Sequence, residues 1–160
     1  FGLCYGMQLL VIEYARNVLK LKDANTREVN PSSKNIIIDI MEDQKEKIAT
    51  KKLGGSMRLG AFTAHLKKGS VAETAYKSPT VSERHRHRYE VNNHYREDLE
   101  KAGLVFSGLS PDGKLAEIAE LPPSKHPFFL GTQFHPEFKA RPLSPHPLFT
   151  AFIKACIKKK

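Results

Sequence analysis

The stretch FGLCYGMQLL, residues 1–10, places Cys4 between Gly2 and Gly6, immediately ahead of a segment with helical periodicity. The pattern G-x-C-x-G has the form of a nucleophile elbow, in which a strand turns sharply into a helix and exposes its corner residue at the carboxyl edge of a sheet. Neighbouring backbone crowds the two flanking positions, so glycine is expected at both. The N-terminus of the helix would lower the pKa of the Cys4 thiol, and the backbone N–H of Tyr5 would face a developing oxyanion. The stretch therefore predicts a cysteine nucleophile.

A nucleophile needs a base, and the segment QFHPEF offers one. The apolar run 128–134 is typical of a strand buried on both faces, and His135 follows it directly. A strand end delivers this histidine to the carboxyl edge where the elbow lies, and Glu137 can hold the imidazole by its second nitrogen. The alternative is a surface loop. Cys4, His135 and Glu137 together predict an acyl-transfer enzyme with a catalytic triad.

The rest of the chain alternates between strand and helix patterns, which indicates an α/β fold with a mostly parallel central sheet. Strands are expected at 35–40, 56–66, 104–109 and 114–121, and helices from residue 7 onward and at 71–76, 96–102 and 147–157. No internal boundary divides residues 1–160, so they are read as one domain. The strand that feeds the elbow is cut off at Phe1, which suggests part of a larger domain.

Composition adds few constraints. A net charge of +9, from 26 Lys and Arg against 17 Asp and Glu, is spread along the chain and is a weak sign of a nucleic-acid partner. There is no signal peptide and no apolar run long enough to span a bilayer, so a cytoplasmic location and no membrane partner are expected. Both cysteines are read as free thiols, and Cys156 as a small buried hydrophobe.

The segment RHRHR, residues 84–88, needs separate treatment. On a strand its arginines lie on one face and its two histidines on the other. From the residues alone, a solvated face and an anion-binding stripe are equally supported. A metal site is disfavoured, because no carboxylate or cysteine lies at ligand spacing in the sequence. His65, His94, His126 and His146 are expected at the surface.

Several segments together resemble the class I, triad-type glutamine amidotransferases, and more narrowly the glutaminase domains of the CTP synthase family. They are GLCYGMQ, YARN, DANTRE, LGGSMRLG, ERHRHRYEVNN, HPFFLGTQFHPEF and RPLSPHPLF, which run from residue 2 to about residue 150. The resemblance implies the three-layer fold of this class. It also implies that Cys4 attacks the side-chain amide of L-glutamine, giving ammonia and a γ-glutamyl thioester that water then hydrolyses.

The resemblance also assigns binding residues. Gln8 and Glu28 would hold the amino-acid end of glutamine, and Arg88 would pair with its α-carboxylate, although Gln8 and Glu28 are unremarkable by their own chemistry. LGGSMRLG matches a lid in which Gly54 and Gly55 hinge and Arg58 is linked to activation by GTP. Tyr5 stands where leucine is usual and Arg27 where a small hydroxyl residue is common. The charged insert at 42–52 has no role assigned to it.

For a full-length enzyme the resemblance implies a synthase domain on the same polypeptide, which uses ATP and magnesium to aminate UTP to CTP, and a homo-oligomer. No cofactor or metal is expected in residues 1–160. The synthase domain, the first strands of the glutaminase domain and the glycine-rich loop with the second oxyanion N–H are expected outside this stretch. Two other functions stay open: another cysteine hydrolase on the same scaffold, of the γ-glutamyl peptidase type, and a non-catalytic basic module that binds RNA or a nucleotide.

Overall fold

The computed structural model describes residues 1–40 and 57–157. Gly54, Gly55 and the insert at 42–52, to which the sequence analysis refers, lie outside the described residues. The helices are α1 (Tyr5–Asn17), α3 (Val71–Tyr76), α4 (Arg96–Lys101) and α5 (Pro147–Ile157), with short 3₁₀ turns η1 (Asn93–Tyr95) and η2 (Pro136–Phe138). The strands are β1 (Gly2–Leu3), β2 (Asn25–Thr26), β3 (Ile36–Ile40), β4 (Arg58–Leu66), β5 (Thr80–His87), β6 (Tyr89–Val91), β7 (Val105–Leu109), β8 (Ala116–Glu120) and β9 (Leu130–Thr132).

The larger sheet has the strand order β1-β9-β8-β7-β4-β5, and a smaller one has the order β2-β3-β6. In the larger sheet, as far as the structure describes it, β1 and β9 are parallel and every other neighbouring pair is antiparallel. The expectation of a mostly parallel sheet is therefore wrong for these residues. Short reversals such as the one between β7 and β8 produce antiparallel neighbours, since a parallel pair needs a longer crossover.

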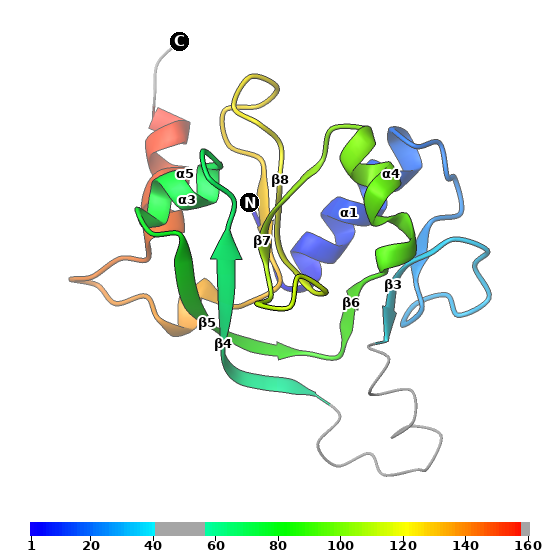
Figure 1. Ribbon diagram of the computed structural model, residues 1–160, viewed down its shortest axis with the longest axis horizontal. Coiled ribbons are helices and arrows are strands. Elements are labelled where there is room, and N and C mark those ends of the chain that lie inside the picture. Colours follow the sequence, from blue (N-terminus) through cyan, green and yellow to red (C-terminus); the bar gives the residue numbers. More distant parts are fainter. Residues whose placement is uncertain (41–56, 158–160) are drawn as a thin grey trace.

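Helices cover both faces of the larger sheet, so the α/β class in three layers is confirmed. Figure 1 shows α1 and α4 on one side of the central strands and α3 and α5 on the other. One core contains Met7 and Val11 of α1 together with Leu99 of α4, and a second contains Ala72 of α3 and Leu148 of α5. Neighbouring residues of β8 point into different cores, Ala119 into the first and Ile118 into the second. None of the helices in the described part of the chain is long and apolar enough to cross a membrane.

Most of the expected helices and strands are present near their expected positions, whereas β2, β5 and β6 were not among the expected strands. The helix expected at 71–76 is α3. Ser70 caps the N-terminus of this helix, because its side chain accepts a hydrogen bond from the Glu73 backbone N–H. The final helix begins and ends where expected, at Pro147 and Ile157. Its inner face consists of Leu148, Ala151, Phe152 and Ala155. Cys156 lies one position further round the helix and is exposed, so the expectation that it is buried is wrong.

Candidate active site

Cys4 occupies the corner between β1 and α1 in a strained backbone conformation, with φ 51° and ψ −104°. Left-handed φ values are costly for a residue with a side chain and persist only where the surroundings enforce them. Here the Cys4 backbone N–H donates to the Thr132 carbonyl of β9 at 2.6 Å, and the Cys4 carbonyl accepts from the first turn of α1. The sharp turn predicted from G-x-C-x-G is therefore present.

The two glycines of the elbow differ in their surroundings. A Cβ added to Gly2 would lie 2.6 Å from the carbonyl carbon of Gly6, whereas one added to Gly6 would meet nothing within 4 Å. Backbone crowding thus requires glycine at position 2 only, and the expectation of crowding at Gly6 is wrong.

This difference predicts opposite effects of two matched substitutions. Gly2→Ala should destabilise the fold by about 1–3 kcal/mol, because the turn must open to admit the methyl group. Gly6→Ala should stabilise it by about 0.5–1 kcal/mol, because alanine restricts the unfolded chain and suits a helix. Urea denaturation of both variants measures the free energies of unfolding. Equal effects of the two substitutions would contradict the crowding seen at Gly2.

His135 follows β9 and lies at the edge of the sheet that carries the elbow. Because β1 and β9 are parallel, with Leu3 opposite Thr132, both chains leave the sheet at the same end. The His135 Nδ1 lies 2.6 Å from Glu137 Oε1. This contact orients the imidazole and directs the other nitrogen, Nε2, away from the carboxylate. The structure therefore brings an oriented histidine to the edge where Cys4 lies.

Gln133 links these two parts of the site and was missed in the sequence. It is fully buried, and its Nε2 donates to the Cys4 sulfur at 3.8 Å. Its Oε1 accepts from the Gln8 Nε2 at 3.4 Å. The signal that could have revealed it is its position between the buried strand and the histidine.

Burial raises the pKa of the Cys4 thiol, and the carboxylates of Glu137 and Glu90 raise it further. Hydrogen bonds from the Tyr5 backbone N–H and the Gln133 amide oppose this but are weaker than burial. The Tyr5 N–H at the helix N-terminus acts in the expected direction, but the expectation that the net pKa of the Cys4 thiol lies below its ordinary value is wrong. A neutral thiol is favoured at rest, so an attack by sulfur needs a base to take its proton.

The raised pKa predicts the pH dependence of Cys4 alkylation. With iodoacetamide, a neutral reagent, the rate at Cys4 should rise with pH and show an apparent pKa above the ordinary thiol value of about 8.5, because only the thiolate reacts. Peptide mass spectrometry separates Cys4 from the exposed Cys156, which serves as an internal reference. A rate at Cys4 that is already constant below neutral pH would show a stabilised thiolate and contradict this direction.

Three other candidate residues gather around Tyr89, a residue that sequence reasoning did not single out as functional. The buried Gln8 donates from Nε2 to the Tyr89 carbonyl at 3.0 Å. Burial raises the pKa of the Tyr89 phenol, and among the charges acting on it Glu28 raises it and Arg88 lowers it. Glu28 and Arg88 are both exposed. Gln8, Glu28 and Arg88, which are expected to bind the amino-acid end of glutamine, thus all act on Tyr89.

Arg58, which the resemblance links to activation by GTP, is a buried residue. It begins β4 opposite His87 of β5 and is 9% exposed. Its Nη1 lies 2.7 Å from Glu117 Oε1 and 3.6 Å from Glu90 Oε1. Arg58 is therefore held in a buried ion-pair cluster in this conformation.

Two histidines of the RHRHR segment complete this cluster. His85 Nδ1 and His87 Nε2 are 2.9 Å apart, and His85 Nε2 lies 3.6 Å from Glu117 Oε2. Burial and the positive charge of Arg58 lower the pKa of His85 to about 2 and that of His87 to about 3, so both rings are neutral. The expected alternation is confirmed, because Arg84, Arg86 and Arg88 are exposed while both histidines are buried.

His146 is also buried, contrary to the surface position expected for it. Its Nε2 lies 3.0 Å from Glu83 Oε1 and 3.2 Å from the Tyr76 hydroxyl. These long-range partners come from α3 and β5, which is why the local sequence did not reveal them. Among the described residues, no group of three or more His, Cys, Asp or Glu side chains is arranged to hold a metal ion.

Comparisons with known proteins agree with this geometry. A family profile described as glutamine amidotransferase class-I matches residues 1–155. The chain is 57% identical over 156 residues to a CTP synthase of Rubrobacter xylanophilus, with 98% of the chain and 27% of the relative covered. It is 54% identical over 160 residues to a CTP synthase of Aquifex aeolicus, with 100% of the chain and 29% of the relative covered. The chain thus spans less than a third of the length of these relatives.

A solved structure gives the same result. The glutaminase domain of the Trypanosoma brucei CTP synthase with bound acivicin is 41% identical and superimposes with a TM-score of 0.89, covering 100% of this chain and 60% of the other. At this identity, the similarity extends beyond the general architecture.

Proposed function

Since this chain belongs to the class-I glutamine amidotransferase family, we propose that it hydrolyses L-glutamine to glutamate and ammonia through Cys4, His135 and Glu137. The observation that carries the proposal is that Cys4 and His135 lie at the same edge of the sheet, because they follow the parallel strands β1 and β9. Cys4 is held at φ 51°, and the His135 ring is held 2.6 Å from the Glu137 carboxylate.

In the proposed mechanism His135 takes the thiol proton as the Cys4 sulfur attacks the amide carbon. This fits a thiol whose pKa is raised by burial, because the neutral form is then the resting one. The backbone N–H of Tyr5 stabilises the oxyanion of the tetrahedral intermediate. His135 then donates its proton to the departing ammonia, which leaves a γ-glutamyl thioester on Cys4. Water attacks the thioester, His135 again acts as the base, and Glu137 holds the ring throughout.

Around the substrate, we assign Arg88 to the α-carboxylate and Glu28 to the α-ammonium group. A planar guanidinium fork matches a carboxylate, and the exposed Glu28 carboxylate, which also acts on the Tyr89 phenol, complements an ammonium ion. Gln8 is assigned with Glu28 to the amino-acid end of glutamine. Its hydrogen bonds to the Tyr89 carbonyl and to Gln133 also keep these two residues in position.

We also propose that Gly54 and Gly55 belong to a lid and that Arg58 is linked to activation by GTP. These roles are supported only by the resemblance of LGGSMRLG to the family's motif.

The whole protein proposed here is a CTP synthase. The relatives from Rubrobacter and Aquifex carry that name and are 57% and 54% identical to this chain. In that enzyme the ammonia would pass to a synthase domain on the same polypeptide and aminate UTP with ATP and magnesium. A homo-oligomer and a cytoplasmic location remain part of this proposal.

The test uses a glutamine analogue with an electrophilic carbon in place of the amide. We expect a single adduct on Cys4 by peptide mass spectrometry, suppressed by excess glutamine, and none on Cys156. Release of glutamate from glutamine but not from a γ-glutamyl dipeptide would separate this function from a γ-glutamyl peptidase. Labelling of Cys156 to the same extent, or no protection by glutamine, would contradict the proposal.

A further inference from the structure

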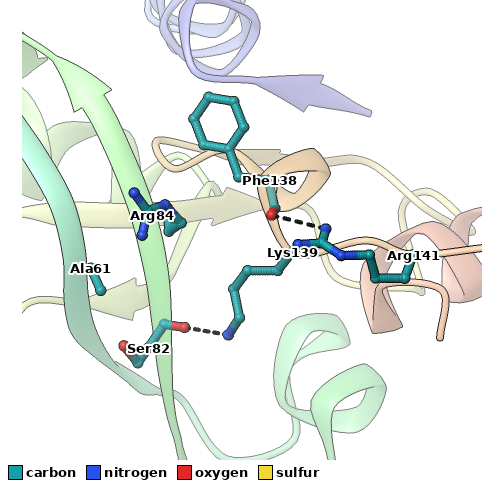
Figure 2. Close-up of a pocket in the computed structure, with 6 residues that line it drawn as sticks. All are labelled: Ala61, Ser82, Arg84, Phe138, Lys139 and Arg141. Carbon is teal, nitrogen blue, oxygen red and sulfur yellow. Dashed lines mark hydrogen bonds between the residues drawn. The ribbon is translucent and has the colours of Figure 1, made fainter.

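A pocket lies beside the candidate site, on the exposed face of the β4–β5 pair. Figure 2 shows its lining, which is formed by Ala61, Ser82, Arg84, Phe138, Lys139 and Arg141. Its volume is about 530 Å³, within the range of about 300–1,000 Å³ typical of small-molecule pockets. Nothing in the proposed hydrolysis of glutamine uses it.

Three cationic side chains line the pocket, and no carboxylate does. Glu83, the residue between Ser82 and Arg84, is 1% exposed, and its side chain is engaged by Tyr76 and His146. It compensates only part of the charge, through a 3.5 Å contact with the Lys139 Nζ. The pocket is therefore positively charged.

Two of the cations are held in place by backbone carbonyls. The Lys139 Nζ donates to the Ser82 carbonyl at 2.7 Å, and the Arg141 Nη1 donates to the Phe138 carbonyl at 3.2 Å (Figure 2). The Arg141 Nη1 also donates to the Ala140 carbonyl at 2.7 Å. These bonds leave further N–H groups on both side chains to donate elsewhere. They also reduce the entropy that each side chain loses when an anion binds.

Arg84 supplies the third charge. In the part of the chain that the structure describes, its guanidinium has no ion-pair or hydrogen-bond partner, although Figure 2 places it at the pocket wall formed by β5. An exposed arginine with five available N–H donors is suited to bidentate contact with a phosphate or a carboxylate.

We propose that this pocket binds the phosphate group of a small organic phosphomonoester. Three cations that line one pocket match a phosphate dianion better than a carboxylate, whose single charge would leave two of them uncompensated. The volume exceeds what a bare phosphate needs, and the Phe138 ring with the Ala61 methyl group offers an apolar wall for the organic part. The ligand class is thus a phosphate joined to an apolar or aromatic group.

The pocket is also in contact with His135 on two sides. The Phe138 ring stacks on the His135 imidazole, with the ring centroids 4.8 Å apart and an interplanar angle of 17°. The Arg84 carbonyl accepts a hydrogen bond from the His135 backbone N–H at 2.9 Å. A ligand that moves either residue will change the environment of His135, which gives a second readout of binding.

The test titrates the purified protein with phenyl phosphate, inorganic phosphate and benzoate by calorimetry at 0.15 M salt. We expect phenyl phosphate to bind most tightly, and a shift of the His135 imidazole resonance to saturate with the same constant. Arg84→Gln and, separately, Arg141→Gln should each weaken phenyl phosphate binding at least tenfold. Arg86→Gln is the matched control, because Arg86 is exposed on the same strand but does not line the pocket.

Three outcomes would overturn the proposal. Equal weakening by Arg86→Gln would show diffuse attraction to a basic surface. Benzoate that binds as tightly as phenyl phosphate would show that the dianion is not recognised. Unchanged affinity in both Arg84→Gln and Arg141→Gln, with thermal melting confirming that each variant is folded, would place the ligand elsewhere. Glutamine hydrolysis is not the readout, so failure here leaves the proposed function intact.

Discussion

Cys4→Ala should abolish glutamine hydrolysis, lowering kcat/KM by roughly 10⁴-fold or more. Alanine leaves the amide without a nucleophile, and the remaining oxyanion donor and bound histidine cannot form the thioester. The loss should appear in kcat, because the proposed contacts to the substrate come from Glu28 and Arg88 rather than from the sulfur. Coupled detection of glutamate measures turnover, and calorimetry with glutamine measures binding by the variant.

The matched control for this prediction is Cys156→Ala, which removes the other, exposed thiol and should leave both quantities unchanged. Glu137→Gln should have an intermediate effect, because the amide can still contact the ring but no longer stabilises a protonated imidazole 2.6 Å away. Hydrolysis that survives in Cys4→Ala would contradict covalent catalysis by this residue. A loss that is confined to binding would mean that Cys4 shapes the pocket instead of reacting.

The elbow and the His135–Glu137 pair could be predicted from sequence because the signals are local. A glycine two residues before a cysteine, a helix after it and a His-Pro-Glu turn after an apolar run each depend on nearby residues. Cys4 and His135 lie at the same edge because β1 and β9 are parallel. The other strand pairs of the larger sheet, as far as it is described, are antiparallel. A pattern reveals that a strand exists but not which strand it pairs with.

The burial of charged groups could not be predicted, because it also depends on which distant elements pack together. The sequence near Arg58 gives no sign of burial, yet its side chain lies against Glu117, which is 59 positions later in the chain. Likewise, His146 meets Glu83 only because α5 packs beside α3 and β5. Such pairs arise when distant elements dock, so their sequence signal is limited to polar residues within otherwise apolar strands, such as Glu117 in β8.

Arg58→Met should destabilise the fold by about 3–5 kcal/mol, because it leaves buried carboxylates without their cation. Methionine keeps the aliphatic part of the side chain but not the guanidinium, whose carbon lies 4.4 Å from the Phe62 ring centroid. The loss therefore reports the ion pairs together with this cation–π contact. Urea denaturation at neutral pH measures the change in the free energy of unfolding.

The cost of this substitution should depend on pH in a definite direction. Burial raises the pKa of Glu117 to about 7, with Arg58 opposing the shift. A carboxyl group with a raised folded pKa stabilises the fold when protonated, and this contribution is lost as pH rises from the unfolded pKa of about 4.3 through the folded one. Without Arg58 the ionised form is disfavoured further. The destabilisation by Arg58→Met should thus be larger at pH 8 than at pH 5.5.

Arg86→Met provides the control for this charge effect. Arg86 pairs with Leu59 in the same β4–β5 ladder, directly beside the Arg58–His87 pair, but its side chain is exposed. Surface substitutions of this kind usually change the free energy of unfolding by no more than about 0.5 kcal/mol, with little dependence on pH. Equal stability of Arg58→Met and Arg86→Met at both pH values would show that the Glu117 carboxylate is protonated or solvated without Arg58. In that case, the buried cluster would set the position of β4 through packing alone.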